Sequence, residues 1–109
     1  MSESLSETEQ LVLLALARLG EDAYGVSVRR EIEERGGRAL SIAAVYNALD
    51  RLERRGCADS WLSEPLPERG GRARKHFQIT PAGADALRAA RGVMERMWDG
   101  LRLASGRSR

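Results

Sequence analysis

The segment 11–19, which reads LVLLALARL, restricts the fold of this chain more than any other feature. Ser6 and Glu9 precede it with the spacing of a capping box, in which each side chain accepts a hydrogen bond from the backbone N–H of the other residue. Gly20 follows it, and glycine is common just after a helix end. We therefore expect a helix from Glu7 to Leu19. Because this helix is apolar nearly all the way round, it must be covered on two sides, by its own domain and by a partner.

Length and composition limit the class of protein. At 109 residues the chain has the size of one domain, and 42% hydrophobic with 31% charged residues is the balance of an ordinary soluble protein. The longest apolar run, 11–17, is too short to cross a bilayer, and the N-terminal acids do not fit a signal peptide. A single cysteine, Cys57, cannot form an intramolecular disulfide, which fits a reducing compartment. We expect a cytoplasmic protein.

The sequence contains no recognisable catalytic or metal-binding motif. His76 is the only histidine and Cys57 the only cysteine, so a metal site of the His/Cys type has no ligand set. No glycine-rich loop joins a strand to a helix in the way that phosphate-binding loops do. We expect no enzyme, no cofactor and no metal. His76 is expected to pack or to lie on the surface, and Cys57 to be a small buried hydrophobic residue.

Capping and turn signals divide the rest of the chain into elements and predict a mainly α (α+β) protein. The expected order is a helix over 24–35, a third helix after the N-cap Ser41, strands over 57–62 and 74–79 joined by a turn-rich connector, and a last helix from Pro81 to about Ala104. Three helices, a two-stranded wing and a long helix are the parts of a winged helix-turn-helix. We expect a DNA-binding domain over residues 1–80, a C-terminal dimerisation helix over 81–104 and a disordered basic tail over 105–109.

The third helix has an apolar stripe and an opposite face of small and polar residues. Ile42, Val45, Leu49 and Leu52 form the stripe, with Tyr46 at its edge, whereas Ala44, Asn47 and Arg51 lie opposite and Ala43 and Arg54 lie near the edge of that face. Small residues allow close approach to a DNA groove, and Asn and Arg side chains can bind base edges or phosphates. Ser41 and the free N–H groups at the helix start can hold a phosphate. The alternative is a solvated face of an ordinary three-helix core, with Tyr46 simply half buried.

The predicted wing carries an uninterrupted cationic segment. Apart from Ala73, residues 69–75 are all basic residues or glycines, without any acid: Arg69, Gly70, Gly71, Arg72, Arg74 and Lys75. Glycine permits close approach to another surface, and arginine is favoured in a narrow minor groove because the negative potential is enhanced there. The alternative is a solvated hairpin, but the position of this segment directly after a helix-turn-helix pattern favours DNA contact.

The last predicted helix has a seam of the coiled-coil kind. Apolar residues recur at steps of three and four: Leu87, Ala90, Met94, Met97, Leu101 and Ala104. A helix of some 24 residues would extend about 36 Å, which is longer than so small a domain is wide. We therefore expect a homodimer in which this seam and the neighbouring Trp98 meet the partner, together with Leu11 and Leu14 of the first helix. Met94, Met97 and Trp98 are also candidates for a pocket that binds a small hydrophobic effector, although such residues at helical spacing more often belong to a core.

Four segments together resemble the PadR-like family of bacterial transcriptional regulators. They are LVLLALARLG, the Ala23-Tyr24-Gly25 opening of the second helix, SIAAVYNALDRLE and the wing segment GGRARKHFQITPAG. The resemblance implies a winged helix-turn-helix repressor that is dimeric through its long C-terminal helix, binds a palindromic promoter site and, in some members, is released by a small molecule. By position, Tyr46 matches the tyrosine of the recognition helix, and Gly70, Gly71, Arg72 and Lys75 match the basic wing. Ala43 replaces a common glycine, and His76-Phe77 stands where two aromatic residues are frequent.

The sequence therefore predicts a dimeric, sequence-specific DNA-binding regulator, most simply a repressor. The alternative is a winged-helix module that binds an acidic protein partner through its basic wing. The two differ in whether a defined DNA sequence is selected. Neither the DNA site nor an effector can be named from these residues.

Overall fold

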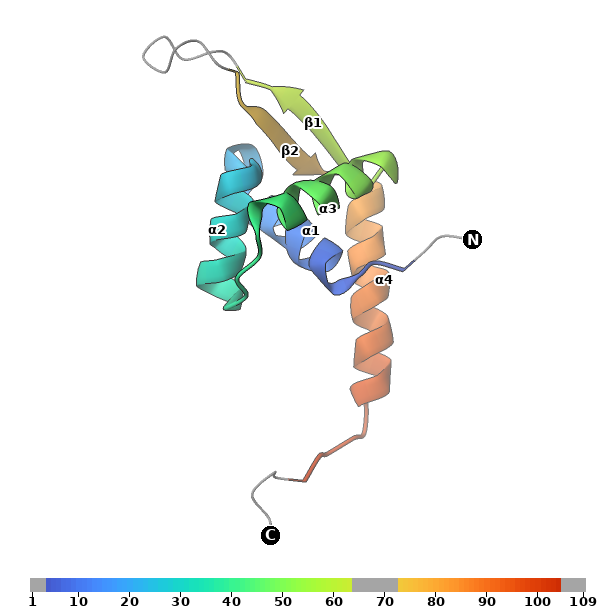
Figure 1. Cartoon of the computed structure of the whole chain (residues 1–109). Coiled ribbons are helices and arrows are strands. Elements are labelled where there is room, and N and C mark those ends of the chain that lie inside the picture. The colour runs from blue at the N-terminus through green and yellow to red at the C-terminus, as the bar shows by residue number, and fades with distance from the viewer. Residues whose placement is uncertain (1–3, 64–72, 105–109) are drawn as a thin grey trace.

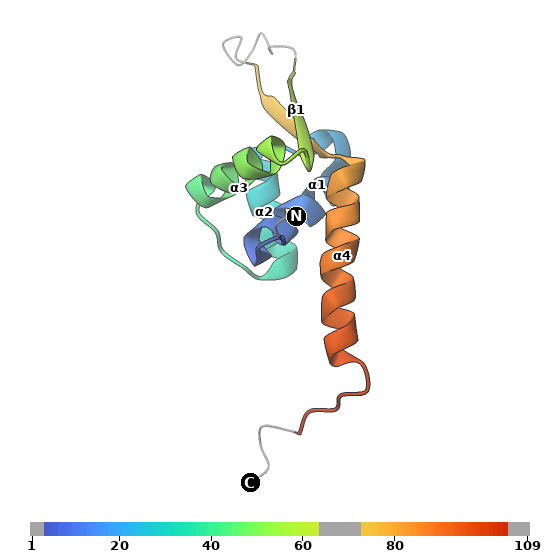
Figure 2. The same cartoon turned by 90° about the vertical axis from the view of Figure 1, so that its right-hand side faces the viewer.

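The computed structural model of the chain describes residues 4–63 and 73–104, and Figure 1 shows their arrangement. The elements follow in the order α1 (Glu7–Leu19), a single 3-10 turn (Gly20–Asp22), α2 (Gly25–Gly36), α3 (Ile42–Arg54), β1 (Ala58–Leu62), β2 (Lys75–Ile79) and α4 (Pro81–Trp98). Three helices form the body, the hairpin rises from one side of it, and α4 descends along another (Figures 1 and 2).

Local capping explains why the first three helices begin and end where they do. The capping box of Ser6 and Glu9 is present at the start of α1. Ser41 caps α3 by accepting the N–H of Ala44 at 3.0 Å. Gly37 ends α2 in the left-handed conformation, with a φ of 67° that other residues rarely adopt. These predictions are confirmed, and α1 has the bounds that the sequence predicts.

The core lies between α1, α2, α3 and the hairpin. The largest fully buried side chains come from the three helices: Leu13, Leu16, Leu49, Leu52, Val12, Val28 and Val45. Phe77 closes this core from β2, and Cys57 is buried at the start of the hairpin, as predicted.

The hairpin is antiparallel, with Ser60 opposite Phe77 and Trp61 opposite His76. Its inner edge is extended by the segment between α1 and α2, because Phe77 donates its N–H to the Ala23 carbonyl at 2.9 Å and Tyr24 pairs with His76. The wing is thus attached to the body by backbone hydrogen bonds at its base.

The last helix is shorter than predicted. Thr80 caps α4 and Pro81 is its first residue, as expected, but α4 ends at Trp98 rather than near Ala104. Asp99 has left the helical conformation, and Gly100 has a φ of 74°. The apolar spacing continues past this turn and hides the Asp-Gly stop signal. The 18 residues of α4 extend about 27 Å, and residues 101–104, with Leu101 of the predicted seam, follow outside the helix.

None of the helices in the described ranges is both long and apolar enough to span a membrane.

Candidate nucleic-acid interface

The outer face of α3 is exposed beside the hairpin, and it is rotated relative to the face that the sequence predicts. Val45, Ala48, Leu49 and Leu52 form the buried side, whereas Ile42 is 40% exposed at the first position of the helix. Because the buried stripe contains Ala48 and not the predicted Ile42, the outer face is rotated about the helix axis. Its exposed residues are Ala43, Asn47, Asp50 and Arg54. The predicted contacts Ala44 and Arg51 lie on the flank toward α1, and Ala44 is only partly exposed.

Arg54 and Asp50 are the outward residues that the helical wheel misplaced or missed. Arg54 pairs with Asp50 one turn earlier through its Nη2 atom, and both side chains are more than half exposed. The outer face of α3 therefore carries one amide, one carboxylate and one guanidinium. All three groups can bind base edges in a major groove.

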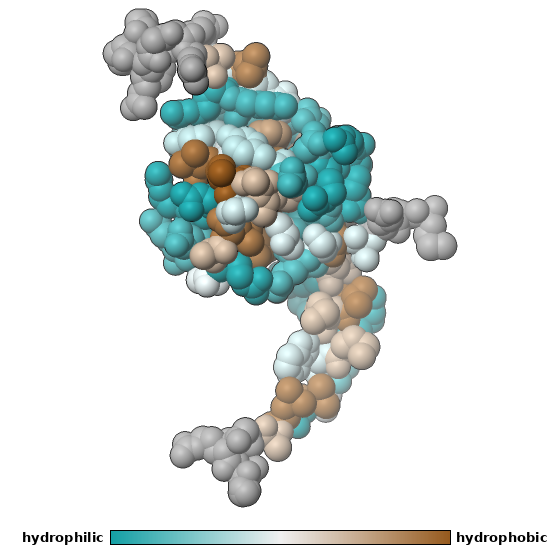
Figure 3. Space-filling model, viewed as in Figure 1, coloured by the Kyte–Doolittle hydropathy of each residue, from teal (hydrophilic) through white to brown (hydrophobic). Residues whose placement is uncertain are grey.

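Tyr46 lies on the flank of α3 that faces α2. It is 44% exposed, and its ring and hydroxyl lie directly against Gly25, where any larger side chain would collide with them. Gly25 is the first residue of α2, so the hydroxyl lies close to a helix N-terminus. Apolar side chains are exposed in this region too, because Val26 and Ile42 are each 40% exposed. Figure 3 shows the resulting brown area over the adjoining parts of α2 and α3.

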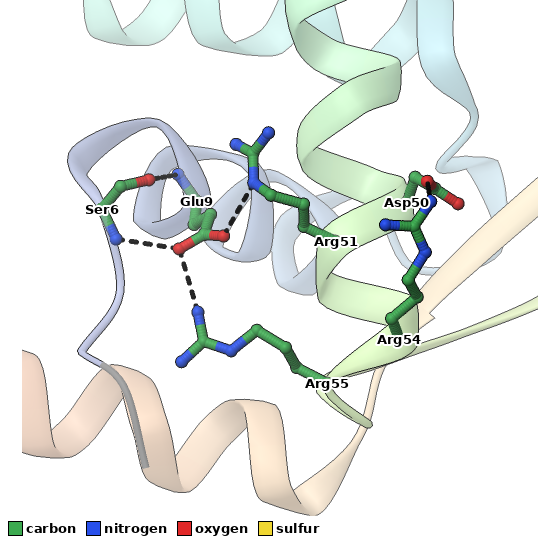
Figure 4. Close-up of polar contacts among 6 residues, drawn as sticks. All are labelled: Ser6, Glu9, Asp50, Arg51, Arg54 and Arg55. Atoms are coloured by element: carbon green, nitrogen blue, oxygen red, sulfur yellow. Dashed lines mark hydrogen bonds and ion pairs between the residues drawn. The ribbon is translucent and has the colours of Figure 1, made fainter.

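A buried carboxylate joins α1 to the C-terminal half of α3. Glu9 is 5% exposed, and its two oxygens accept hydrogen bonds from Ser6 N–H at 2.9 Å, Arg51 Nε at 3.1 Å and Arg55 Nη1 at 3.1 Å. We call these four residues the Glu9 cluster (Figure 4). Burial raises the pKa of Glu9, but the hydrogen bonds from Ser6 and Arg51 and the charges of Arg55 and Arg51 outweigh it, so the pKa lies below its ordinary value. The carboxyl group is therefore ionised at neutral pH.

A second carboxylate joins α3 to the hairpin. Glu53 accepts a hydrogen bond from the Ser60 hydroxyl of β1 at 2.6 Å and lies 3.7 Å from Lys75 Nζ of β2. Lys75 also lies 5.4 Å from the ring centre of Phe77. Glu53 thereby links α3 to both strands of the hairpin. The sequence predicts Lys75 as a DNA contact but gives no sign of this pairing.

The outer side of the hairpin is a stack of rings. Trp61 stacks on His76 with ring centres 5.4 Å apart, and Tyr24 meets the His76 ring edge-on at 5.8 Å. The Arg74 guanidinium lies 4.1 Å from the centre of the Tyr24 ring. His76 is therefore a packing residue, as the sequence predicts. Arg74 and Lys75 are exposed at the start of β2, opposite the end of β1 and away from the body, whereas Arg69, Gly70, Gly71 and Arg72 lie outside the described residues.

The predicted dimer residues fall into two groups. Leu11 and Leu87 are partly buried against the core, and Leu14 is 48% exposed. Leu14 and Leu87 line an open, mainly apolar groove of about 540 Å³ between α1 and α4. Met94, Met97, Trp98 and Leu101 are more than half exposed. They belong to the part of the chain that projects below the body (Figure 2), where Figure 3 shows brown, hydrophobic residues at the surface.

The arrangement defines a class of protein. Three helices followed by a two-stranded hairpin, with the third helix exposed next to it, make a winged helix-turn-helix. The sequence model described as the transcriptional regulator PadR-like family matches residues 12–89. The chain therefore belongs to the PadR-like family of transcriptional regulators. Its members are DNA-binding regulators rather than enzymes, which confirms the predicted family, fold and non-enzymatic class.

Solved structures agree with this assignment. A PadR-family regulator from Eggerthella lenta is 26% identical, with a TM-score of 0.68 over 84% of this chain and 77% of the other. A complex structure of RosR from H. salinarum is 25% identical, with a TM-score of 0.64 over 90% and 77%. A transcriptional regulator from Clostridium thermocellum, at 23% identity, shares the fold with a TM-score of 0.69 over 83% and 84%. No curated protein sequence matches the chain significantly.

Proposed function

We propose that this DNA-binding regulator is a dimeric repressor of a palindromic promoter site. The exposed outer face of α3 carries the proposal, because it presents small and polar groups next to a hairpin with the exposed basic residues Arg74 and Lys75. Such a helix fits the major groove. Two copies related by a twofold axis would meet half-sites about 34–36 Å apart, which is one turn of DNA.

Residues of α3 have separate roles in this proposal. Asn47 faces the bases, and the methyl side chain of Ala44 leaves room for a DNA strand beside the helix. Ser41 uses its oxygen as a helix cap, which leaves its hydroxyl proton to donate to a phosphate. The hydroxyl of Tyr46 lies beside the N-terminus of α2, where N–H groups and the helix dipole favour an anion. We therefore assign Tyr46 to a phosphate contact.

The wing supplies most of the affinity for DNA. Arg69, Gly70, Gly71, Arg72, Arg74 and Lys75 would lie along the flanking minor groove. The test is a salt series on duplex DNA with the four basic residues changed together to Ala. The slope of log affinity against log salt should become shallower by about 0.9 for each phosphate contact removed. An unchanged slope and affinity would exclude this role of the wing.

Dimerisation completes the site. Met94, Met97, Trp98 and Leu101 supply the exposed apolar surface that a second copy would cover, together with Leu14 and the α1–α4 groove. Selection of binding sites from a random-sequence DNA pool tests both symmetry and specificity. A palindromic motif supports the proposal, whereas no enriched motif favours the alternative of a protein-interaction module.

A small hydrophobic effector is the regulatory part of the proposal. Met94, Met97 and Trp98 have flexible or aromatic side chains that adapt to ligands when a partner helix encloses them. Quenching of tryptophan fluorescence by a ligand should be abolished in Trp98→Ala and retained in Trp61→Ala. Quenching that survives in Trp98→Ala would place the ligand elsewhere.

A further inference from the structure

Arg51 is a predicted DNA contact that is held by a buried partner. Its side chain is 48% exposed, while that of Glu9 is 6% exposed. Among the residues that the structure describes, Arg51 makes one side-chain hydrogen bond, from Nε to Glu9. Figure 4 shows the two terminal nitrogens of Arg51 pointing away from that carboxylate. The outer edge of the guanidinium is therefore available to a second anion.

The position of Arg51 on α3 indicates that the second anion is a phosphate of the DNA backbone. Arg51 lies on the flank of α3, whereas Asn47 and Arg54 lie on its outer face. When a helix enters the major groove, its outer face meets the bases and its flanks meet the phosphate strands that border the groove. Ala44 shares the flank of Arg51 because it stands seven residues earlier, and its methyl group leaves space for a strand.

The chemistry of the Glu9 cluster also favours binding of a phosphate by Arg51. A buried ion pair is weak evidence for stability, since desolvation of the charges offsets their attraction. A carboxylate that binds Nε fixes the plane of a guanidinium and leaves two parallel N–H groups facing outward. That pair matches two oxygens of a phosphate. Arg55 binds the other oxygen of Glu9, so that two cations compensate for the buried anion.

We infer that Glu9 is a positioning residue for DNA binding, which orients Arg51 so that its terminal nitrogens bind a backbone phosphate. The inference rests on the proposed placement of α3 in the major groove. It gives a prediction whose sign is opposite to that of simple electrostatics. Removing the negative charge of Glu9 should weaken DNA binding, although a more positive protein ought to bind DNA more tightly.

The experiment measures affinity for two duplexes over a salt series, one selected by the wild-type protein from a random pool and one of mixed sequence. Arg51→Ala should weaken binding to both by about tenfold and make the salt slope shallower by about 0.9 for each phosphate that is no longer bound. Glu9→Gln should weaken both several-fold. The Glu9→Gln effect should vanish in the Arg51→Ala background, because coupled residues are not additive.

Two further variants separate the proposed positioning effect of Glu9 from effects on stability and on net charge. Arg51→Lys keeps the charge on a half-exposed side chain and should fold normally, but an ammonium cannot bind Glu9 and a phosphate bidentately, so binding should still weaken. The matched control is the α2 pair, in which Arg35 Nε lies 2.9 Å from Glu31. Glu31→Gln makes the same charge change as Glu9→Gln and should leave the affinity equal or slightly higher.

Three outcomes overturn the inference: Arg51→Ala and Arg51→Lys that bind like the wild type, a Glu9→Gln protein that binds more tightly, or an effect of Glu9→Gln that persists without Arg51. Asn47→Ala and the fourfold wing variant distinguish these from failure of the proposed function. If they weaken binding while the Arg51 variants do not, only the role of the Glu9 cluster is wrong. If they also leave binding unchanged, the proposed DNA-binding surface itself is wrong.

Discussion

Helices α3 and α4 differ in how their apolar side chains are covered. Inside one chain, α3 is covered on its apolar side by the core, joined to α1 through Glu9 and joined to the hairpin through Glu53. Only the first half of α4 is packed, through Gly83 and Leu87, and its second half projects with apolar side chains exposed. The contrast fits the proposed function, in which one chain forms the DNA-binding surface and a second copy covers the exposed half of α4.

The largest effect in this comparison should come from the buried side of α3. Leu49 is fully buried, so Leu49→Ala should lower the free energy of unfolding by about 2–5 kcal/mol, because apolar burial decreases and a cavity remains. Urea denaturation of both proteins at one fixed concentration measures it. Leu62→Ala is the control, because Leu62 is 68% exposed and its truncation should change stability by less than about 0.5 kcal/mol. A similar loss of stability in both variants would contradict the placement of the core.

A truncation of the same kind on α4 should act on association instead. Changing Met97 and Trp98 together to Ala should raise the dissociation constant of the proposed dimer by roughly thirtyfold, the scale of a hot-spot truncation at an interface. Sedimentation equilibrium over a range of concentrations measures this, and circular dichroism should show the helices intact. If the variant dimerises like the wild type, the exposed half of α4 is not the interface.

The difference between α3 and α4 also marks what the sequence could predict. The bounds of α1 and α3 depend on caps within four residues, and such signals are readable from the chain itself. The sequence predicts the end of α4 too late, because apolar spacing outweighs Asp99-Gly100. The hydrogen bonds of Glu9 with Arg51 and Arg55 connect residues that are 42 and 46 positions apart in the sequence. They depend on how α1 crosses α3, which no local pattern encodes.

The outer face of α3 shows the same limit at a smaller scale. Helical periodicity identifies the exposed Asn47 and the edge position of Tyr46. It places Ile42 inside the stripe, although this residue lies at the helix start, beyond the edge of the core. That single error rotates the predicted face away from Asp50 and Arg54. The close contact between Tyr46 and Gly25 could not be predicted either, because it joins two helices.

The packed half of α4 can be tested by two glycines in one helix. A methyl group at Gly83 would collide with the Cys57 carbonyl, so Gly83→Ala should destabilise the protein by about 1–3 kcal/mol. At Gly92 the nearest atom is Arg96 Nη1, the end of a flexible side chain, at 3.2 Å. Gly92→Ala should therefore gain up to about 1 kcal/mol from helix propensity. Thermal denaturation measures both, and equal signs would contradict the close approach of α4 to the hairpin base.

The smallest expected effect concerns pH and the α1–α3 connection. Because the pKa of Glu9 is lower in the folded than in the unfolded chain, its ionised form stabilises the fold. This contribution is fully present above the unfolded pKa and disappears as the pH falls through the folded pKa. The stability difference between wild type and Glu9→Gln should therefore narrow on acidification below about pH 4.5, the ordinary pKa of the group.

The Arg51→Ala background shows how much of this pH dependence comes from α3. There the hydrogen bond and charge of Arg51 no longer lower the pKa of Glu9, so the narrowing should still begin near the ordinary pKa but be smaller and end at a higher pH. Urea denaturation at a series of pH values measures it in both backgrounds. Parallel pH profiles would mean that Arg51 does not contribute to the ionisation of Glu9, and that α3 is held to α1 by apolar packing alone.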